Sequence, residues 1–213
     1  MPRDGSATRT AIMDAAEELI LERGFAGTTI DDILEVTGVT KGAFFHHFAS
    51  KRDLAHALIK RYASLDLDHL EEKLARAEAS ISDPLEQLLA FAGWFQEEAE
   101  ALTQPYPGCL MGSYCYEAGL MDDEIMGVVR SNMLTWRRRL TEKLREVAAA
   151  HPPRRDVDLP SLADQINVAF EGAFILSKVL QEPGVVAAQV QHHRTYLELL
   201  FGADGAEGGF NDS

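Results

Sequence analysis

The chain has 213 residues and a formal net charge of −14, with 20 basic against 34 acidic side chains. This acidity argues against a protein that binds nucleic acid through bulk positive charge. No apolar run approaches the ~20 residues that a membrane-spanning helix needs, and the N-terminal residues lack the apolar core of a signal peptide. We therefore expect a cytoplasmic protein that does not enter a membrane.

The composition favours helices. Hydrophobic residues make up 46% of the chain and aromatic residues 8%, and no segment shows the period-two alternation of a half-buried strand. We predict an all-α protein of about nine helices without an internal repeat. Cys109 and Cys115 point to different faces of a predicted helix, so we expect two free thiols rather than a disulfide.

Three short helices and one long helix are expected in the N-terminal part. The first should cover residues 8–23, with Gly24 in the left-handed conformation at its C-terminal end. A threonine pair followed by two aspartates predicts a second, short helix that starts at residues 28–29 and ends near Thr37. Thr40 is expected to cap a third helix that ends near residue 47, and Ser50 to open a long fourth helix through a capping box.

Residues 29–48 are predicted to form a helix-turn-helix with its tight turn at Gly38. The expected interior of this unit consists of Ile30, Ile33, Val36, Val39, Phe44 and Phe48. The unit is too small to fold alone, so the first helix must pack across its back. The second helix of the pair would present its N-terminal residues to the base edges in a DNA major groove. The side chains expected to point outward are Thr40, Lys41, Ala43, Phe45 and His46.

Charge does not support this motif by itself. Residues 1–54 carry six basic and nine acidic side chains. Binding to DNA must therefore depend on a few well-placed cations, of which Lys41 and Lys51 are the candidates, and on threonine hydroxyls and helix N-termini that donate to phosphates.

Caps and prolines delimit the remaining helices. Asp83 followed by Pro84 predicts a helix start, and Pro105 and Pro107 interrupt the chain before residues 108–119. Further helices are expected over residues 122–150, 160–181 and 185–201. The tail from residue 202 to 213 is rich in Gly and acidic residues, and is expected to be disordered.

The first sixty-odd residues resemble the TetR family of bacterial one-component regulators. The residues that carry the resemblance are Ile12, Ala15, Ala16, Leu19, Gly24, Phe25, 28–30, Ile33, 38–48, Ser50, Lys51 and Leu54. The remainder resembles the family only in its helical layout. The resemblance implies a helix-turn-helix DNA-binding domain over residues 6–66 and a ligand-binding and dimerisation domain over residues 67–201.

Under this resemblance a set of side chains contacts DNA. Those implied to touch phosphates are Thr28, Thr29, Lys41, Phe45, His46 and Lys51, and those implied to lie near bases are Thr40, Gly42 and Ala43. Family members usually have Tyr where Phe45 stands, so Phe45 is limited to apolar contact with a thymine methyl or a sugar. Leu34 replaces the small residue usual at its position, and either widens the helix crossing or stays partly exposed.

The resemblance also implies a small-molecule effector that binds in the second domain. Aromatic and sulfur side chains concentrate there, in a segment interrupted by prolines and glycines, and such side chains can line an adaptable apolar pocket. The predicted ligand-binding residues are Phe91, Trp94, Phe95, Cys109, Met111, Tyr114, Met126, Trp136, Phe170 and Phe174. For each of them, ordinary core packing is the alternative. Cys109 is either a structural cysteine, which we favour, or a redox or electrophile sensor.

The last two helices are predicted to form a homodimer interface as a four-helix bundle. The apolar face of the penultimate helix consists of Ala163, Ile166, Ala169, Phe170, Ala173, Phe174 and Ser177, and that of the last helix of Val186, Val190, His193, Leu197 and Leu200. The alternative is that both faces cap the core of the monomer.

Two other classes of function fit the sequence less well. A di-metal enzyme on a helical bundle needs two Glu-x-x-His pairs and two further Glu residues, and only Asp66 and His69 loosely match this pattern. A helical protein-binding adaptor would not require the capped turn and the two lysines in register. We therefore expect no enzyme, no metal and no cofactor. The favoured function is a ligand-responsive regulator, most simply a repressor that a small apolar or aromatic effector releases from its operator DNA.

Overall fold

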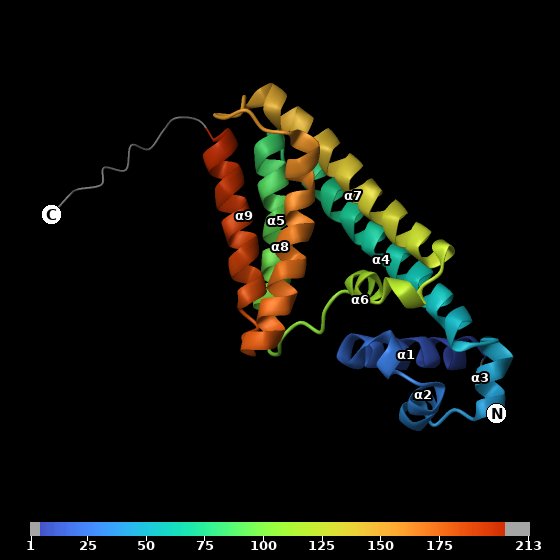
Figure 1. Ribbon diagram of the computed structural model, residues 1–213. Coiled ribbons are helices and arrows are strands. Elements are labelled where there is room, and N and C mark those ends of the chain that lie inside the picture. The colour runs from blue at the N-terminus through green and yellow to red at the C-terminus, as the bar shows by residue number, and fades with distance from the viewer. Residues whose placement is uncertain (1–4, 203–213) are drawn as a thin grey trace.

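The computed structural model describes residues 5–202 (Figure 1). Within that range the protein has nine α-helices and one short 3₁₀ helix and no strand, which confirms the all-α prediction. None of these helices combines the length and the apolar character needed to cross a membrane. The predicted disorder of the tail concerns residues that, apart from Gly202, lie outside the described range.

The N-terminal helices follow the predicted caps. They are α1 (Gly5–Gly27), α2 (Ile30–Thr37), α3 (Lys41–His47) and the long α4 (Lys51–Ser80). Gly38 ends α2 with φ 64° and ψ 15°, the left-handed conformation that glycine adopts at little cost. Gly24, with φ 80° and ψ 165°, kinks the chain but does not end the first helix at residue 23 as predicted, since α1 continues to Gly27. Only half of the capping box at Ser50 forms. The Ser50 hydroxyl accepts a hydrogen bond from the Asp53 N–H, but the Asp53 carboxylate accepts from the Ala49 N–H.

The C-terminal helices also start and end near the predicted residues. They are α5 (Pro84–Glu100), α6 (Leu110–Tyr116), the 3₁₀ helix η1 (Ala118–Leu120), α7 (Asp123–Ala150), α8 (Leu159–Leu180) and α9 (Val185–Phe201). Asp83 caps α5, with Pro84 at the start of the helix, as its sequence predicts. Both cysteines are free thiols, in agreement with the prediction.

The helices form two large hydrophobic cores that α4 connects, and a third, small core of Ala99, Ala173, Val186 and Ala187 lies between α5, α8 and α9. The N-terminal core consists of α1–α3, the first half of α4, α6 and the start of α7. The second core consists of the other half of α4, α5, the C-terminal half of α7, α8 and α9. In Figure 1, α5, α8 and α9 stand side by side, while α4 and α7 run together diagonally from this bundle towards α1–α3. A change in the bundle can therefore reach the N-terminal helices along α4.

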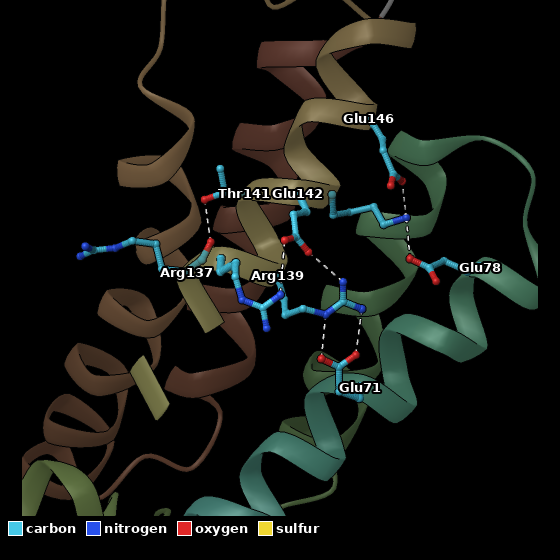
Figure 2. Close-up of polar contacts among 9 residues, drawn as sticks. Glu71, Glu78, Arg137, Arg139, Thr141, Glu142 and Glu146 are labelled. Carbon is cyan, nitrogen blue, oxygen red and sulfur yellow. Dashed lines mark hydrogen bonds and ion pairs between the residues drawn. The ribbon is translucent and has the colours of Figure 1, made fainter. Parts of the chain in front are cut away.

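Ion pairs join α4 and α7 along their length. Figure 2 shows the Arg139 guanidinium of α7 in two hydrogen bonds to the Glu71 carboxylate of α4, at 2.7 and 2.8 Å, and in a third to Glu142. Further along, the Lys143 ammonium contacts Glu78 at 2.8 Å and Glu146 at 2.6 Å. The carboxylates of these pairs are exposed or partly exposed, so solvent weakens the pairs, whereas the Lys143 ammonium itself is buried. Arg139–Glu71 and Lys143–Glu78 thus connect α7 to α4 at two places along their length.

Two packing predictions are corrected. Val36 was expected inside the helix-turn-helix, but its side chain is 60% exposed. The faces predicted for dimerisation are largely buried inside the monomer, where Ile166 and Leu197 belong to the second core. The alternative, that these faces cap the monomer core, is the one the structure supports. Periodicity identifies an apolar face but does not say whether its own chain or a second copy covers it.

Candidate DNA-binding surface and effector cavity

Local hydrogen bonds fix the angle between α2 and α3. The Thr29 hydroxyl accepts from the Asp32 N–H at 3.1 Å, and the Asp32 carboxylate accepts from the Thr29 N–H at 2.7 Å, which completes a capping box. Bonds from the Thr29 side chain and backbone lower the pKa of Asp32. The Gly38 N–H donates to the Leu34 carbonyl, and the Thr40 hydroxyl accepts from the Ala43 N–H to cap α3. The turn is therefore held by bonds within residues 29–43.

The outer face of α3 is open to a partner. Lys41 and Phe45 are exposed, with 66% of the Lys41 side chain and 46% of Phe45 accessible. Thr40 and His46 are also exposed, and Ala43 is half-buried. A Cβ added at Gly42 would meet no atom within 4 Å, so this position allows another molecule to approach the backbone closely. Thr40, Lys41, Phe45 and His46 are exposed as predicted, whereas Ala43 packs partly against the N-terminal core. Phe44 is buried behind them.

An acidic neighbour moderates the charge of this face. The Lys41 ammonium lies 3.6 Å from the Asp31 carboxylate, and both side chains are largely exposed. Phe45 meets the buried Phe44 edge-on at 5.3 Å between ring centroids, which orients its ring on the helix surface. The face thus offers one cation, one aromatic ring, threonine hydroxyls and exposed backbone within two helical turns.

The side chains of two residues predicted to contact phosphates instead contact groups within the protein. Thr28 is fully buried, and its hydroxyl donates to the Gly24 carbonyl at 2.9 Å, so the side chain cannot make the predicted contact. The Lys51 ammonium lies 4.1 Å above the centre of the Phe25 ring and donates to the Phe25 carbonyl, and burial lowers its pKa. Both residues stabilise the turn between α1 and α2.

A carboxylate from outside the N-terminal helices holds the same turn. Glu117, at the end of α6, accepts from the Phe25 N–H at 2.6 Å and from the Ala26 N–H at 2.8 Å. A Cβ on Gly24 would lie 2.6 Å from the same carboxylate, so the glycine is needed for this approach as well as for its φ value. The sequence offered no local signal for Glu117, because its partners precede it by more than 90 residues.

A cavity of about 400 Å³ lies between the two cores. Six of the ten predicted ligand-binding residues line it: Phe95, Cys109, Met111, Trp136, Phe170 and Phe174. The other lining residues are Glu17, Tyr62, Leu65, Asp66, His69, Glu98, Ala99, Leu102, Tyr106, Met133, Asn167, Glu171 and Val186. Its volume falls in the range of drug-sized ligand sites, about 300–1,000 Å³.

The other four predicted residues lie outside this lining. Phe91 is buried in the second core and Tyr114 in the first. Trp94 is covered by the Arg76 guanidinium, 4.1 Å from the ring centre, and Met126 is half-buried on α7. For Phe91 and Tyr114, the alternative of ordinary core packing is the one that the structure supports.

Several lining residues are not among the predicted ligand-binding residues, because the prediction considered only aromatic and sulfur side chains. Tyr62, Leu65, Asp66 and His69 follow one face of α4 at helical spacing, a signal visible in the sequence. In the sequence, Tyr62 and Leu65 are indistinguishable from an ordinary apolar stripe. Glu171 of α8 had no such signal, because nothing local shows which face of α8 borders the cavity.

Aromatic rings form a continuous wall of the cavity. Trp136 and Phe95 lie 6.1 Å apart between ring centroids, Phe95 and Phe170 5.4 Å, and Phe170 and Phe174 5.9 Å. Tyr106 then stacks on Phe174 at 4.4 Å. These contacts within the range of aromatic pairing hold the rings of α5, α7, α8 and the loop before α6 in fixed positions.

The chemistry of Cys109 favours a structural role. Burial raises the pKa of its thiol to about 12, and the nearby Glu171 carboxylate acts in the same direction. The thiolate is the reactive form of cysteine, and with its pKa raised in this way only a small fraction of Cys109 is ionised near neutral pH.

Among residues 5–202, no cluster of three or more His, Cys, Asp or Glu side chains is arranged to hold a metal ion.

Comparisons with known proteins agree with this arrangement. A family model described as bacterial regulatory proteins of the tetR family matches residues 12–58, and one described as a tetracyclin repressor-like C-terminal domain matches residues 84–193. The chain is 30% identical over 185 residues to the transcriptional regulator AcuR of Cereibacter sphaeroides, covering 84% of this chain and 80% of AcuR. It is 26% identical to the transcriptional repressor DhaR of Mycobacterium sp. (strain GP1), over 80% of this chain and 82% of DhaR.

A solved structure shows the same fold over nearly the whole chain. The crystal structure of a TetR-family transcriptional regulator from Agrobacterium tumefaciens superposes with a TM-score of 0.75 at 25% identity, covering 93% of this chain and all of that one. Such regulators bind DNA and are not enzymes. With an exposed recognition helix, a second helical domain and matches to both family models, the chain belongs to the TetR family of transcriptional regulators.

Proposed function

We propose that this protein is a repressor that a small apolar or aromatic effector releases from operator DNA. The observation that carries the proposal is the composition of the cavity wall. The wall includes Tyr62 and Asp66 of α4, Met111 of α6 and Glu17 of α1, and these three helices also build or hold the N-terminal core. A ligand in the cavity therefore touches the helices that support α2 and α3.

The contacts suggest how such a ligand acts. A ligand that binds one arrangement of α4 and α6 better than another shifts the population towards that arrangement. Glu117 joins the end of α6 to the α1–α2 turn, and α4 begins next to α3. A shift of α4 or α6 therefore moves the proposed DNA-contacting residues of α2 and α3, which we call the reading surface. Operator affinity changes because a dimer binds two half-sites at a fixed separation.

A homodimer is part of the proposal, with an interface different from the predicted faces. On α8, Val168, Ile175 and Val179 are 68%, 48% and 73% exposed, and on α9 Tyr196 and Leu199 are 41% and 63% exposed. Their spacing puts each set on one face of its helix. Large apolar side chains exposed in contiguous stripes are typical of interaction surfaces, and TetR-family regulators act as dimers.

The DNA contacts proposed for each protomer come from residues that the structure leaves accessible. They are Thr29, Thr40, Lys41, Gly42, Ala43, Phe45 and His46. The sign of regulation is proposed by analogy, because the relative DhaR is named a repressor.

Selection of bound duplexes from a random DNA library tests the first half of this proposal. We expect enrichment of a site with twofold symmetry, and enrichment of no sequence would contradict it. The selected duplex then serves to test release, by titrating apolar and aromatic compounds into the complex. Compounds that bind the protein should lower its affinity for the duplex, and compounds that bind without changing that affinity would contradict an effector role.

A further inference from the structure

The cavity has acidic groups without matching cations in its lining. Its carboxyl side chains are Glu17, Asp66, Glu98 and Glu171. Among the described residues that line it, none is Lys or Arg, and His69 is the single side chain with a basic group. A ligand that enters this space meets aromatic faces and carboxyl groups.

Two of the four carboxylates are neutralised from outside the lining. Glu17 is paired with the Arg61 guanidinium at 2.7 Å. Glu98 is paired with the Lys73 ammonium at 2.6 Å, and that ammonium also lies over the Phe95 ring. These pairs leave little net charge for a ligand to satisfy.

The other two carboxyl groups lack such a partner. Asp66 accepts from the Trp136 indole N–H at 2.6 Å, and Glu171 accepts from the Cys109 thiol. Within residues 5–202 neither forms an ion pair with Lys or Arg, and burial raises the pKa of both. His69 lies one helical turn from Asp66 and is itself exposed. A buried carboxylate without a cation is costly, so a cation that enters the cavity gains from pairing with it.

Glu171 is placed beside a position that leaves it room. A Cβ added at Gly112 of α6 would lie 2.7 Å from the Glu171 carboxylate, so the glycine allows this group of α8 to rest against α6. Asp66 reaches the cavity from α4 on another wall. Burial raises the pKa of the Tyr106 hydroxyl, at the end of the aromatic wall, and Cys109, Glu17, Asp66 and Glu171 act in the same direction. The acidic groups and the rings therefore border one shared space.

We infer that the effector is an amphiphilic organic cation. Its amine or quaternary ammonium group pairs with Glu171 and Asp66, and its apolar or aromatic body packs on the wall from Trp136 to Tyr106. Aromatic faces attract such cations as well, most strongly where water is excluded. A ligand carboxylate or phosphate is excluded by the same carboxyl groups, since the lining offers it no Lys or Arg. This inference rests on the proposed function, whose effector it assigns to a chemical class.

The test is calorimetric titration of the full-length protein with matched probes. The cations are benzyltrimethylammonium, benzyltriethylammonium and benzyltributylammonium. The neutral probes are the corresponding benzyl compounds with carbon in place of nitrogen, and the anion is 4-tert-butylbenzoate. We expect at least one cation to bind about tenfold or more tightly than its neutral counterpart, a difference of about 1.4 kcal/mol, and no binding of the anion. Neutral probes that bind as tightly as the cations, or no binding by any cation, would overturn the inference.

Variants connect the preference to the two carboxyl groups. Glu171→Gln and Asp66→Asn keep the size of each side chain and remove its charge, and each should weaken the binding of the cation about tenfold while leaving the neutral probes unaffected. Glu100→Gln, an exposed residue at the end of α5, is the matched control and should change neither. Melting temperatures establish that each variant is folded. Unchanged cation affinity in both folded variants would also overturn the inference.

Operator binding in the same samples separates the two proposals. Neutral compounds that bind the cavity and release the selected duplex would contradict the inferred cationic class of effector but not the proposed function. A protein that binds cations as expected but enriches no DNA sequence contradicts the proposed function instead.

Discussion

Lys41 and Asp31 show how a strongly acidic protein can still present a cation to DNA. The two side chains lie 3.6 Å apart on neighbouring helices, and both are mostly exposed. In the free protein the carboxylate partly compensates the ammonium, and a phosphate has to compete with it. Nonspecific adhesion to DNA is reduced by this arrangement, while a correctly placed phosphate gains the full contact.

The variant Asp31→Asn should therefore bind operator DNA about three- to tenfold more tightly, with a larger relative gain for nonspecific duplex. The removed charge no longer competes for Lys41 or repels phosphates. Fluorescence anisotropy at two salt concentrations measures the change, with Asp68→Asn as the control at an exposed aspartate of α4. Equal affinities for Asp31→Asn and the unsubstituted protein would show that this carboxylate does not moderate the reading surface.

Cys109 should be unreactive in the folded protein. With its pKa raised to about 12 by burial, only about one thiol in 10⁵ is ionised at pH 7, against roughly one in 30 for an unperturbed cysteine. Iodoacetamide labelling followed by mass spectrometry should leave Cys109 unmodified until the protein is denatured. Rapid labelling of Cys109 under native conditions would restore the redox or electrophile sensor as the better interpretation.

At the scale of elements, the contact between Glu117 and the α1–α2 turn joins the second domain to the reading surface. The two N–H groups that the carboxylate binds belong to Phe25 and Ala26, and Lys51 of α4 holds the carbonyl of Phe25 from another side. The turn is thus fixed between α6 and α4, two of the helices that line the cavity.

Substitution of Glu117 by Ala should destabilise this turn. Hydrogen bonds to a charged group contribute about 1.5–3 kcal/mol when buried, and since these are partly exposed we expect a decrease in stability of about 1–2 kcal/mol. Hydrogen exchange measured by mass spectrometry should become faster in the peptide that covers residues 24–30. Glu72→Ala, at an exposed position of α4, is the control. Exchange as slow as in the unsubstituted protein would mean that α6 does not hold the turn.

The helices themselves were largely predictable, for a local reason. The caps at Thr29, Thr40 and Asp83 and the turn at Gly38 depend on neighbouring residues, and all four are found in the structure. The predicted helix end at Gly24 is instead a kink inside α1. The surroundings of each side chain were less predictable, because they depend on tertiary packing. Thr28 is of a residue type that often caps helices at the surface, yet it is fully buried and its hydroxyl donates to the Gly24 carbonyl.

The candidate site was predictable only in part, for the same reason. Six of the ten predicted aromatic and sulfur side chains line the cavity. The polar residues that give the cavity its chemistry, Asp66 and Glu171, come from helices far apart in the chain. Only the tertiary packing brings them together, so no spacing in the sequence could have paired them.

At the scale of the whole molecule, the exposed stripes on α8 and α9 are the surface that we propose a second copy covers. Val179 is 73% exposed near the end of α8, where an isolated chain would gain nothing from a large apolar side chain. A helix pair from each of two protomers would bury both stripes in a four-helix arrangement.

The substitution Val179→Asp should convert the dimer to monomers, because it brings like charges into an apolar interface at two symmetry-related places. Size-exclusion chromatography with light scattering measures the mass, and circular dichroism verifies that the helices remain. Arg145→Ala, at an exposed position of α7, is the control. A variant that remains dimeric would place the interface elsewhere.

The reading of DNA by α3 is the central claim, and the operator affinity of Lys41→Ala tests it most directly. Labelled duplex obtained by selection is titrated with the unsubstituted protein, Lys41→Ala and the control Arg145→Ala over a range of salt concentrations. We predict that Lys41→Ala binds about tenfold or more weakly, and that the slope of log K against log salt becomes shallower by about 0.9 for each phosphate that Lys41 neutralises in the unsubstituted protein. Arg145→Ala should match the unsubstituted protein. Equal affinity and equal salt dependence for Lys41→Ala, in a folded dimer, would contradict the account.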